Sequence, residues 1–219
     1  TTSFDSDGFT FGSGGNGNVS GLNYVNYAWK AGGTPSINTD GTIISLVSAN
    51  QAAGFSIVKY TGNSTAGATV GHGLSTAPQL IIVKLLGGIS AKAWTVYSET
   101  LGNTNYLYLN EDYQSQNNVD FWNNTSPVSD KFTVSSDTNV NSSSGSYIAY
   151  CFTSIAGYSK VGSYTGNGAV STSNPLQTTG FQPDFVMIKR TDSTGAWFIF
   201  DSNRNPSNPR NKFLQANLS

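Results

Sequence analysis

The stretch GFSIVKYTGN at residues 54–63 returns in a looser form as GYSKVGSYTGN at residues 157–167. Two further pairs of similar stretches follow in the same order. PQLIIVK becomes PDFVMIK at 183–189, and AWTVYS becomes AWFIFD at 196–201. Three pairs that keep their order at an offset of about 100 residues predict a duplicated structural module.

The repeat is out of phase with the ends of the chain. FTF at residues 9–11 and YVNYAW at residues 24–29 resemble FTV at residues 132–134 and YIAYCF at residues 147–152. These matches place the second half of a repeat unit before its first half. The chain therefore opens with the back half of one unit and closes with the front half of another.

This phase predicts three parts. Residues 1–53 form the back half of a unit plus a linker, residues 54–156 form a complete unit, and residues 157–219 form a front half. The front half can be completed by residues 1–53 of the same chain or of a neighbouring chain. In either case, the strands at 9–11 and 24–29 should pair in one sandwich with those expected at 185–189 and 197–200.

The composition favours strands over helices. Charged residues make up 11% of the 219 residues, far below the roughly 25% of ordinary soluble domains. Aromatic residues are frequent, with 12 Phe, 11 Tyr and 4 Trp. Because Gly, Ser, Thr and Asn supply the remaining polarity, short strands joined by tight turns are expected.

Short β-branched or aromatic runs bounded by turn residues predict the individual strands. They lie at 55–60, 80–85, 94–97, 106–109, 131–134, 147–152, 158–164, 185–189, 197–200 and 213–215. The run at 147–152 is typical of a central strand. Residues 31–50 form either a linker with a hairpin or an edge excursion. The predicted fold class is all-β, with antiparallel β-sandwich or jelly-roll-like modules in tandem repeat.

Charge and residue counts disfavour several functions. The net charge of −1 argues against nucleic acid as a partner, and the lack of an apolar run near 18 residues argues against membrane insertion. Cys151 is expected to be a buried, inert thiol, and His72 a loop residue. Asp5 and Asp7 are expected to lie in a turn rather than in a calcium-binding loop. We expect no catalytic site, no metal and no cofactor, and therefore no enzyme.

A carbohydrate-binding site is the more specific hypothesis. Sugars are often held by an aromatic face together with amide or carboxylate groups, and loop aromatics are functional more often than core aromatics. One segment between expected strands supplies these residue types: Tyr113, Asp120, Trp122, Asn123 and Asn124. The alternative interpretation is that Phe121 and Trp122 only anchor the loop to the sandwich.

Several unusual strings also resemble a known family. DSDGFT at 5–10, AWKAGG at 28–33, TVGHGL at 69–74 and YTGNG at 164–168 are similar to a repeat family from large structural proteins of marine tailed phages. The resemblance covers nearly the whole chain. It implies a virion protein, tail-fibre or tail-associated, and it implies no catalytic or binding residues. Because such proteins usually run past both ends of this chain, an excised or processed segment is expected.

The functional expectation follows from that resemblance. It is a bacteriophage virion structural protein, a tail-fibre or particle-surface module involved in host-surface attachment. It would be located in the virion and be extracellular after release. The expected partners are other virion proteins, further copies in a homo-oligomer, and a host surface glycan. The alternatives are a capsid-decorating or filament-forming subunit that assembles by exchanging half units, and a lectin-like carbohydrate-binding module.

Overall fold

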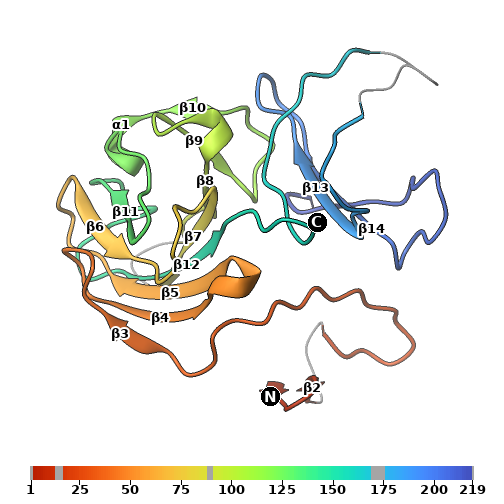
Figure 1. The fold of residues 1–219 in the computed structure, drawn as a ribbon, viewed down its shortest axis with the longest axis horizontal. Coiled ribbons are helices and arrows are strands. Elements are labelled where there is room, and N and C mark those ends of the chain that lie inside the picture. The colour runs from red at the N-terminus through yellow and green to blue at the C-terminus, as the bar shows by residue number, and fades with distance from the viewer. Residues whose placement is uncertain (1, 13–16, 88–90, 169–175, 219) are drawn as a thin grey trace.

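A computed structural model describes residues 2–12, 17–87, 91–168 and 176–218 of the chain. Its regular structure is nearly all β, and the ladders between its named strands are antiparallel (Figure 1). The expectation of an all-β, antiparallel fold is therefore confirmed.

The largest element is an eight-stranded sheet, here called the main sheet, with the strand order β10-β9-β8-β7-β12-β5-β4-β3. Its strands are β3 (Ser36–Asn38), β4 (Ser45–Asn50), β5 (Phe55–Thr61), β7 (Leu80–Gly87), β8 (Thr95–Ser98), β9 (Asn105–Tyr108), β10 (Gln116–Asn117) and β12 (Ser146–Phe152). β12 pairs with β5 on one side and β7 on the other, so the predicted central strand is confirmed. Residues 31–50 contain the β3–β4 hairpin, which forms one edge of this sheet.

Three smaller sheets and three short helical turns complete the described structure. β6 (Ala68–Gly71) pairs with β11 (Lys131–Val134), and β1 (Thr2–Phe4) pairs with β2 (Phe9–Phe11). The C-terminal sheet consists of β13 (Phe185–Lys189), β14 (Trp197–Asp201) and β15 (Leu214–Gln215). The turns are η1 (Gln51–Ala53), α1 (Val119–Trp122) and η2 (Glu99–Leu101).

The main core lies between one face of the main sheet and the layer made by β6, β11 and α1. Burial alternates along β12, with Tyr147, Ala149 and Cys151 fully buried, because successive side chains of a strand point to opposite faces. From the opposite layer, Phe132 and Val134 of β11 enter the same cluster. Full burial of a large apolar side chain such as Phe132 or Val134 contributes about 1.5–3 kcal/mol of hydrophobic stabilisation.

A second core cluster lies on the other face of the main sheet. Ile82, Val96 and Leu107 project from neighbouring strands and contact Trp197 of β14. Met187 of β13 packs against the same cluster. The Trp197 indole also donates a hydrogen bond to the Tyr108 carbonyl at 2.8 Å. The C-terminal sheet is therefore docked on the main sheet by both apolar and polar contacts.

The C-terminal sheet has the same strand registers as β7–β8–β9. In the main sheet, Leu80 lies opposite Ser98, and the sequence-equivalent pair in the C-terminal sheet is Phe185 opposite Asp201. A side-chain contact is shared as well. The Trp94 amide donates to Asn110 Oδ1 at 2.7 Å, and the equivalent Trp197 amide donates to Asn217 Oδ1 at 2.8 Å.

Two expected strands are absent from the described structure. Residues 158–164 form no ladder, and only an isolated bridge joins Ile155 to Ser159. Residues 24–29 form no ladder either, and β2 pairs with β1 rather than with the C-terminal sheet. The pairing of β2 with β1 has a simple physical reason. A hairpin with a short loop costs less chain entropy than a pairing with strands far along the chain.

Residues 24–29 nevertheless contact the C-terminal sheet. The Trp29 and Phe185 rings are edge-to-face with centroids 6.0 Å apart. The Tyr27 hydroxyl donates to Asp201 Oδ2 at 2.8 Å and accepts from Arg204 Nη2 at 3.2 Å. Asp201 also forms an ion pair with Arg204 and is almost fully buried. We call Tyr27, Asp201 and Arg204 the polar clamp.

His72 lies in the loop after β6, as predicted, and its side chain is fully buried. Its Nδ1 accepts from the Leu74 amide at 3.1 Å, which leaves Nε2 to donate to the Val128 carbonyl at 3.0 Å. Burial lowers the pKa of His72, although the Val128 carbonyl and the carboxylates of Asp130 and Asp40 oppose that shift. The folded protein therefore holds the neutral ring.

We expect the free energy of unfolding to fall as the pH drops below about 6.5, because the unfolded chain then binds a proton that the folded protein resists. Urea titrations at pH 7.5 and pH 5.5 measure this loss. A His72→Gln variant, although less stable overall, should lose less stability between the two pH values than the parent. An equal loss in both proteins would contradict the assignment.

Candidate functional site

The segment proposed for sugar binding folds as a loop, a two-residue strand and one helical turn. Tyr113 lies in the loop between β9 and β10, and α1 follows directly. The Asn118 side chain caps α1 by accepting from the Asp120 amide at 2.9 Å. The predicted residues are therefore divided between the loop and the helical turn.

The structure corrects the role expected for Trp122. Its side chain is 1% exposed, and its ring lies edge-to-face on Tyr97 with centroids 5.7 Å apart. Phe121 is equally buried. A ring without an open face cannot stack on a sugar, so Trp122 is a core residue. The structure favours the alternative interpretation, in which Phe121 and Trp122 anchor the loop.

Asp120, Asn123 and Asn124 shape the chain around α1. The Asp120 carboxylate accepts from the Ser136 hydroxyl at 3.2 Å. Asn123 and Asn124 have positive φ angles of 53° and 49°, and the Asn123 amide donates to the Val119 carbonyl at 2.9 Å. Asn is one of the few residues with a side chain that adopts this left-handed conformation readily. None of the three lines the cavity that contains Tyr113.

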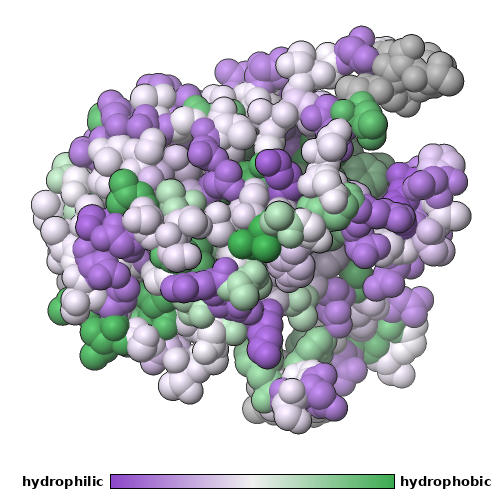
Figure 2. Space-filling model, in the orientation of Figure 1, coloured by the Kyte–Doolittle hydropathy of each residue, from purple (hydrophilic) through white to green (hydrophobic). Residues whose placement is uncertain are grey.

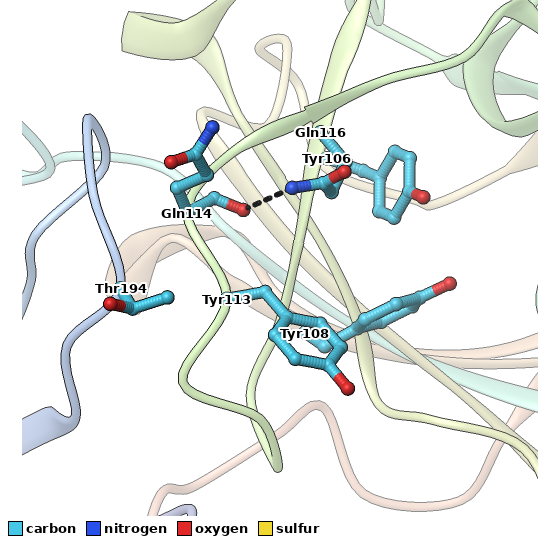
Figure 3. A pocket seen from close by; sticks show the side chains of 6 residues that line it. All are labelled: Tyr106, Tyr108, Tyr113, Gln114, Gln116 and Thr194. Atoms are coloured by element: carbon cyan, nitrogen blue, oxygen red, sulfur yellow. Dashed lines mark hydrogen bonds between the residues drawn. The ribbon is translucent and has the colours of Figure 1, made fainter.

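Tyr113 lines a cavity of about 430 Å³ that we call the aromatic cavity. Its lining residues are Tyr106, Tyr108, Tyr113, Gln114, Gln116 and Thr194. In the view of Figure 3, Gln114 and Gln116 lie on one side and the rings of Tyr108 and Tyr113 on another. Thr194 approaches from the loop between β13 and β14. The cavity thus joins the edge of the main sheet to the C-terminal sheet.

Main-chain hydrogen bonds fix the Tyr113 loop to the β13–β14 hairpin. The Ser115 amide donates to the Thr191 carbonyl at 2.9 Å, and the Gly195 amide donates to the Asp112 carbonyl at 2.8 Å. The Lys189 ammonium also donates to the Asp112 carbonyl at 3.2 Å. Because these bonds flank Tyr113 on both sides, the loop and the hairpin hold the cavity wall together.

The tyrosine rings differ in how they are engaged. Tyr106 stacks face-to-face on Phe121 with centroids 3.7 Å apart and meets Tyr108 edge-on at 5.1 Å. Tyr113 is 51% exposed and has no ring-to-ring contact with any described residue. The cavity therefore combines two fixed rings with one open aromatic face.

The lining of the aromatic cavity is electrically neutral at physiological pH. Burial is the main cause that raises the pKa of Tyr108 far above its ordinary value of 10, and the adjacent Tyr106 hydroxyl adds to it. The Tyr108 hydroxyl therefore stays protonated and can donate a hydrogen bond. Amide and hydroxyl groups make up the rest of the polar lining.

Other candidate chemistry lies outside this cavity. Cys151 is fully buried as predicted, and burial raises the pKa of its thiol to about 12, which keeps it protonated. Asp5 accepts from Thr10 Oγ1 at 2.8 Å in the turn that precedes β2. Within residues 2–12, 17–87, 91–168 and 176–218, no group of three His, Cys, Asp or Glu side chains could hold a metal ion. No helix in those ranges is long and apolar enough to cross a membrane.

Comparison with known proteins identifies a family for this chain. A family model described as a domain of unknown function, DUF7483, matches residues 1–219. No curated protein and no solved structure matches the chain.

Proposed function

We propose that this chain, which belongs to the DUF7483 family, is a bacteriophage virion structural protein. It acts as a tail-fibre or particle-surface module and is built from two related β-sandwich units in tandem repeat. The observation that carries the proposal is the shared register of β7–β8–β9 and β13–β14–β15. Repeated β-units of this kind allow an elongated protein to be built from many copies of one packing arrangement.

In this proposal, one unit is a continuous segment of the chain, and the other is made of two separate segments. Residues 54–156 form the complete unit, in which β6, β11 and α1 cover one face of the main sheet. Residues 157–219 supply the front half of the second unit, and residues 1–53 supply its back half. By equivalence with β12, residues 24–29 take the place beside β13. The contact between Trp29 and Phe185 supports this, because the equivalent Phe152 and Leu80 are direct cross-strand partners.

The polar clamp supports completion of the second unit within one chain. The Tyr27 hydroxyl makes two hydrogen bonds within the same chain, to Asp201 and from Arg204, which are themselves joined by an ion pair. A tethered segment has a high effective concentration, typically in the millimolar range, for a site that it can reach. This contact therefore favours a self-contained module over a filament that assembles by exchange of half units.

The surface composition suits a particle exposed to the medium. Charged residues make up 11% of the chain, and the net charge is −1. On the face shown in Figure 2, most of the surface has intermediate or hydrophilic hydropathy, with separate apolar spots. A neutral polar surface limits unspecific electrostatic attraction to nucleic acid and membranes. The resemblance of residues 5–10 and 69–74 to structural repeats of marine phages supports the assignment of this chain to a virion.

Immunogold electron microscopy of purified virions tests the proposal. An antibody raised against the recombinant chain should label a fixed position on intact particles, such as the tail or the capsid surface. Peptides of the chain should also be found by mass spectrometry in particles banded on a density gradient. Detection in infected cells without detection in purified particles would contradict the proposal.

A further inference from the structure

The aromatic cavity is open to solvent, and its volume and neutral polar lining suit a small neutral ligand. Its volume of about 430 Å³ lies within the roughly 300–1,000 Å³ of known ligand pockets. Three tyrosines, two glutamines and one threonine line it, and none of these side chains is charged at neutral pH. An ionic ligand such as a phosphate would find no counter-charge in the lining, whereas a neutral ligand with many hydroxyl groups meets donors and acceptors.

Tyr113 is the most conspicuous part of the cavity. A tyrosine ring that is 51% exposed keeps a large apolar face in water. Covering such a face is favourable by about 25 cal/mol for each Å² of apolar surface. The carbon–hydrogen face of a pyranose ring offers a flat, weakly apolar surface for this contact, and its hydroxyl groups point outward to the cavity walls.

Hydrogen-bonding groups surround that open face. The Gln116 side-chain amide donates to the Gln114 carbonyl at 3.2 Å, which orients it and leaves its oxygen and second hydrogen available. Gln114 and Thr194 are exposed, so their polar groups can reach a ligand without losing an internal partner of the described structure. Glutamine and tyrosine together supply both donors and acceptors, as alternating sugar hydroxyls require.

The cavity is also preorganised. Tyr106 is held by its stack on Phe121, and the Tyr113 loop is held by the bonds between residues 112–115 and 191–195. A site whose walls are fixed before binding loses less conformational entropy when a ligand enters. This matters for sugars, because exchanging hydrogen bonds with water gives only a small net gain per bond.

We infer that the aromatic cavity binds a neutral saccharide, with one sugar ring on Tyr113 and its hydroxyl groups bonded to Tyr108, Gln114 and Gln116. The site keeps Tyr113 from the sequence prediction and replaces Asp120, Trp122, Asn123 and Asn124 by residues of β9, β10 and the β13–β14 loop. It supplies a glycan contact for host attachment. It does not depend on where in a particle the chain is located.

The test is a glycan array probed with the purified full chain. The array should carry neutral oligosaccharides containing glucose, galactose, mannose or N-acetylglucosamine, with sialylated and sulfated glycans for comparison. We expect binding to at least one neutral glycan. Calorimetry with that glycan should then show a loss of affinity of about tenfold or more for Tyr113→Ala, because a ring contact of this kind is removed.

Two further variants keep the test decisive. Tyr158→Ala removes another exposed tyrosine, 58% exposed and outside the cavity, and should bind like the parent. Thr194→Arg places a long side chain at the cavity wall from the C-terminal side and should abolish binding without altering the three tyrosines. No binding by the parent, binding only to charged glycans, or equal binding by Tyr113→Ala and the parent would each overturn the inference. Immunogold labelling of virions would be unaffected by any of these outcomes.

Discussion

Replacing Trp122 with alanine is expected to lower the free energy of unfolding by about 3–5 kcal/mol. The Trp122 side chain is fully buried between Tyr97 and the rest of the main core. Its removal leaves a cavity in a cluster that joins the main sheet to α1. Since packed interiors relax only partly around such a void, the lost contacts are not recovered. Urea denaturation followed by circular dichroism measures the change.

A Trp122→Phe variant separates ring packing from indole chemistry. The Trp122 indole nitrogen is buried without a hydrogen-bond partner among the described residues. Phenylalanine keeps an aromatic ring and removes that unpaired donor, so we expect a cost of only about 1 kcal/mol. If Trp122→Ala left stability unchanged but abolished glycan binding, the ring would have to be accessible, and its placement in the core would be wrong.

Tyr113→Ala, in the loop that precedes β10, provides the matched comparison. Its ring is half exposed, so truncation should change the free energy of unfolding by less than about 0.5 kcal/mol. The two substitutions therefore have opposite expected effects. Trp122→Ala is expected to lower stability, whereas Tyr113→Ala is expected to weaken the proposed glycan binding, although both residues come from one aromatic-rich segment of the sequence.

Several of the strands that cross the core could be predicted from the sequence. Residues 131–134 and 185–189 form strands with the predicted bounds, and the apolar run at 147–152 lies at the centre of the main sheet. β6 was not predicted, because ATVG at 68–71 is short and borders on glycine. The strand predicted at 158–164 is wrong, because an apolar pattern forms a strand only where a neighbour supplies the other half of each hydrogen bond.

The candidate site could be predicted only in part from the sequence, for a related reason. Tyr113 was predicted to be a loop aromatic, whereas Tyr106 and Tyr108 were predicted only as parts of the strand at 106–109. Thr194 belongs to a different repeat unit in the sequence and reaches the cavity only through docking of the C-terminal sheet. Burial of Trp122 was equally hidden, because one helical turn decides which of two adjacent aromatic residues points inward, and here both do.

The second large effect is expected at the polar clamp. Asp201 is 6% exposed and accepts from the Arg204 amide at 2.8 Å, from Tyr27 and from the Arg204 guanidinium. Removing one partner of a buried ion pair typically costs about 3–5 kcal/mol. Because the Arg204 side chain is 19% exposed and can recover some hydration, we expect about 2–3 kcal/mol for Asp201→Ala.

The loss should be local to the proposed second unit, made of residues 1–53 and 157–219. Hydrogen exchange measured by mass spectrometry should accelerate in residues 24–29 and in β13 and β14, whereas β5 and β12 of the complete unit keep their protection. Asp192→Asn is the control, because its ion pair with Arg190 is exposed on both sides and should contribute nothing measurable. Equal acceleration in both units would mean that the two units unfold together.

Acid should reproduce the effect of the substitution. Burial alone raises the pKa of Asp201, but hydrogen bonds from the Arg204 amide, Tyr27 and the Arg204 guanidinium outweigh it and lower the pKa below its ordinary value. The stabilisation by Asp201 is therefore complete above about pH 4 and is lost as the pH falls below that value. Protection factors of residues 24–29, which correct for the intrinsic pH dependence of exchange, should fall over this range in the parent but not in Asp201→Asn, which has no proton to gain.

The same variants decide how the second unit is completed. If Tyr27 meets Asp201 of its own chain, protection of residues 24–29 must be independent of protein concentration, and Tyr27→Phe and Asp201→Asn must be non-additive in a monomer. If instead neighbouring chains exchange their N-terminal halves, protection rises with concentration. Mixing Tyr27→Phe with Asp201→Asn would then restore one intact clamp for every two chains. A monomer with concentration-independent protection is the outcome that the geometry of Tyr27, Asp201 and Arg204 supports.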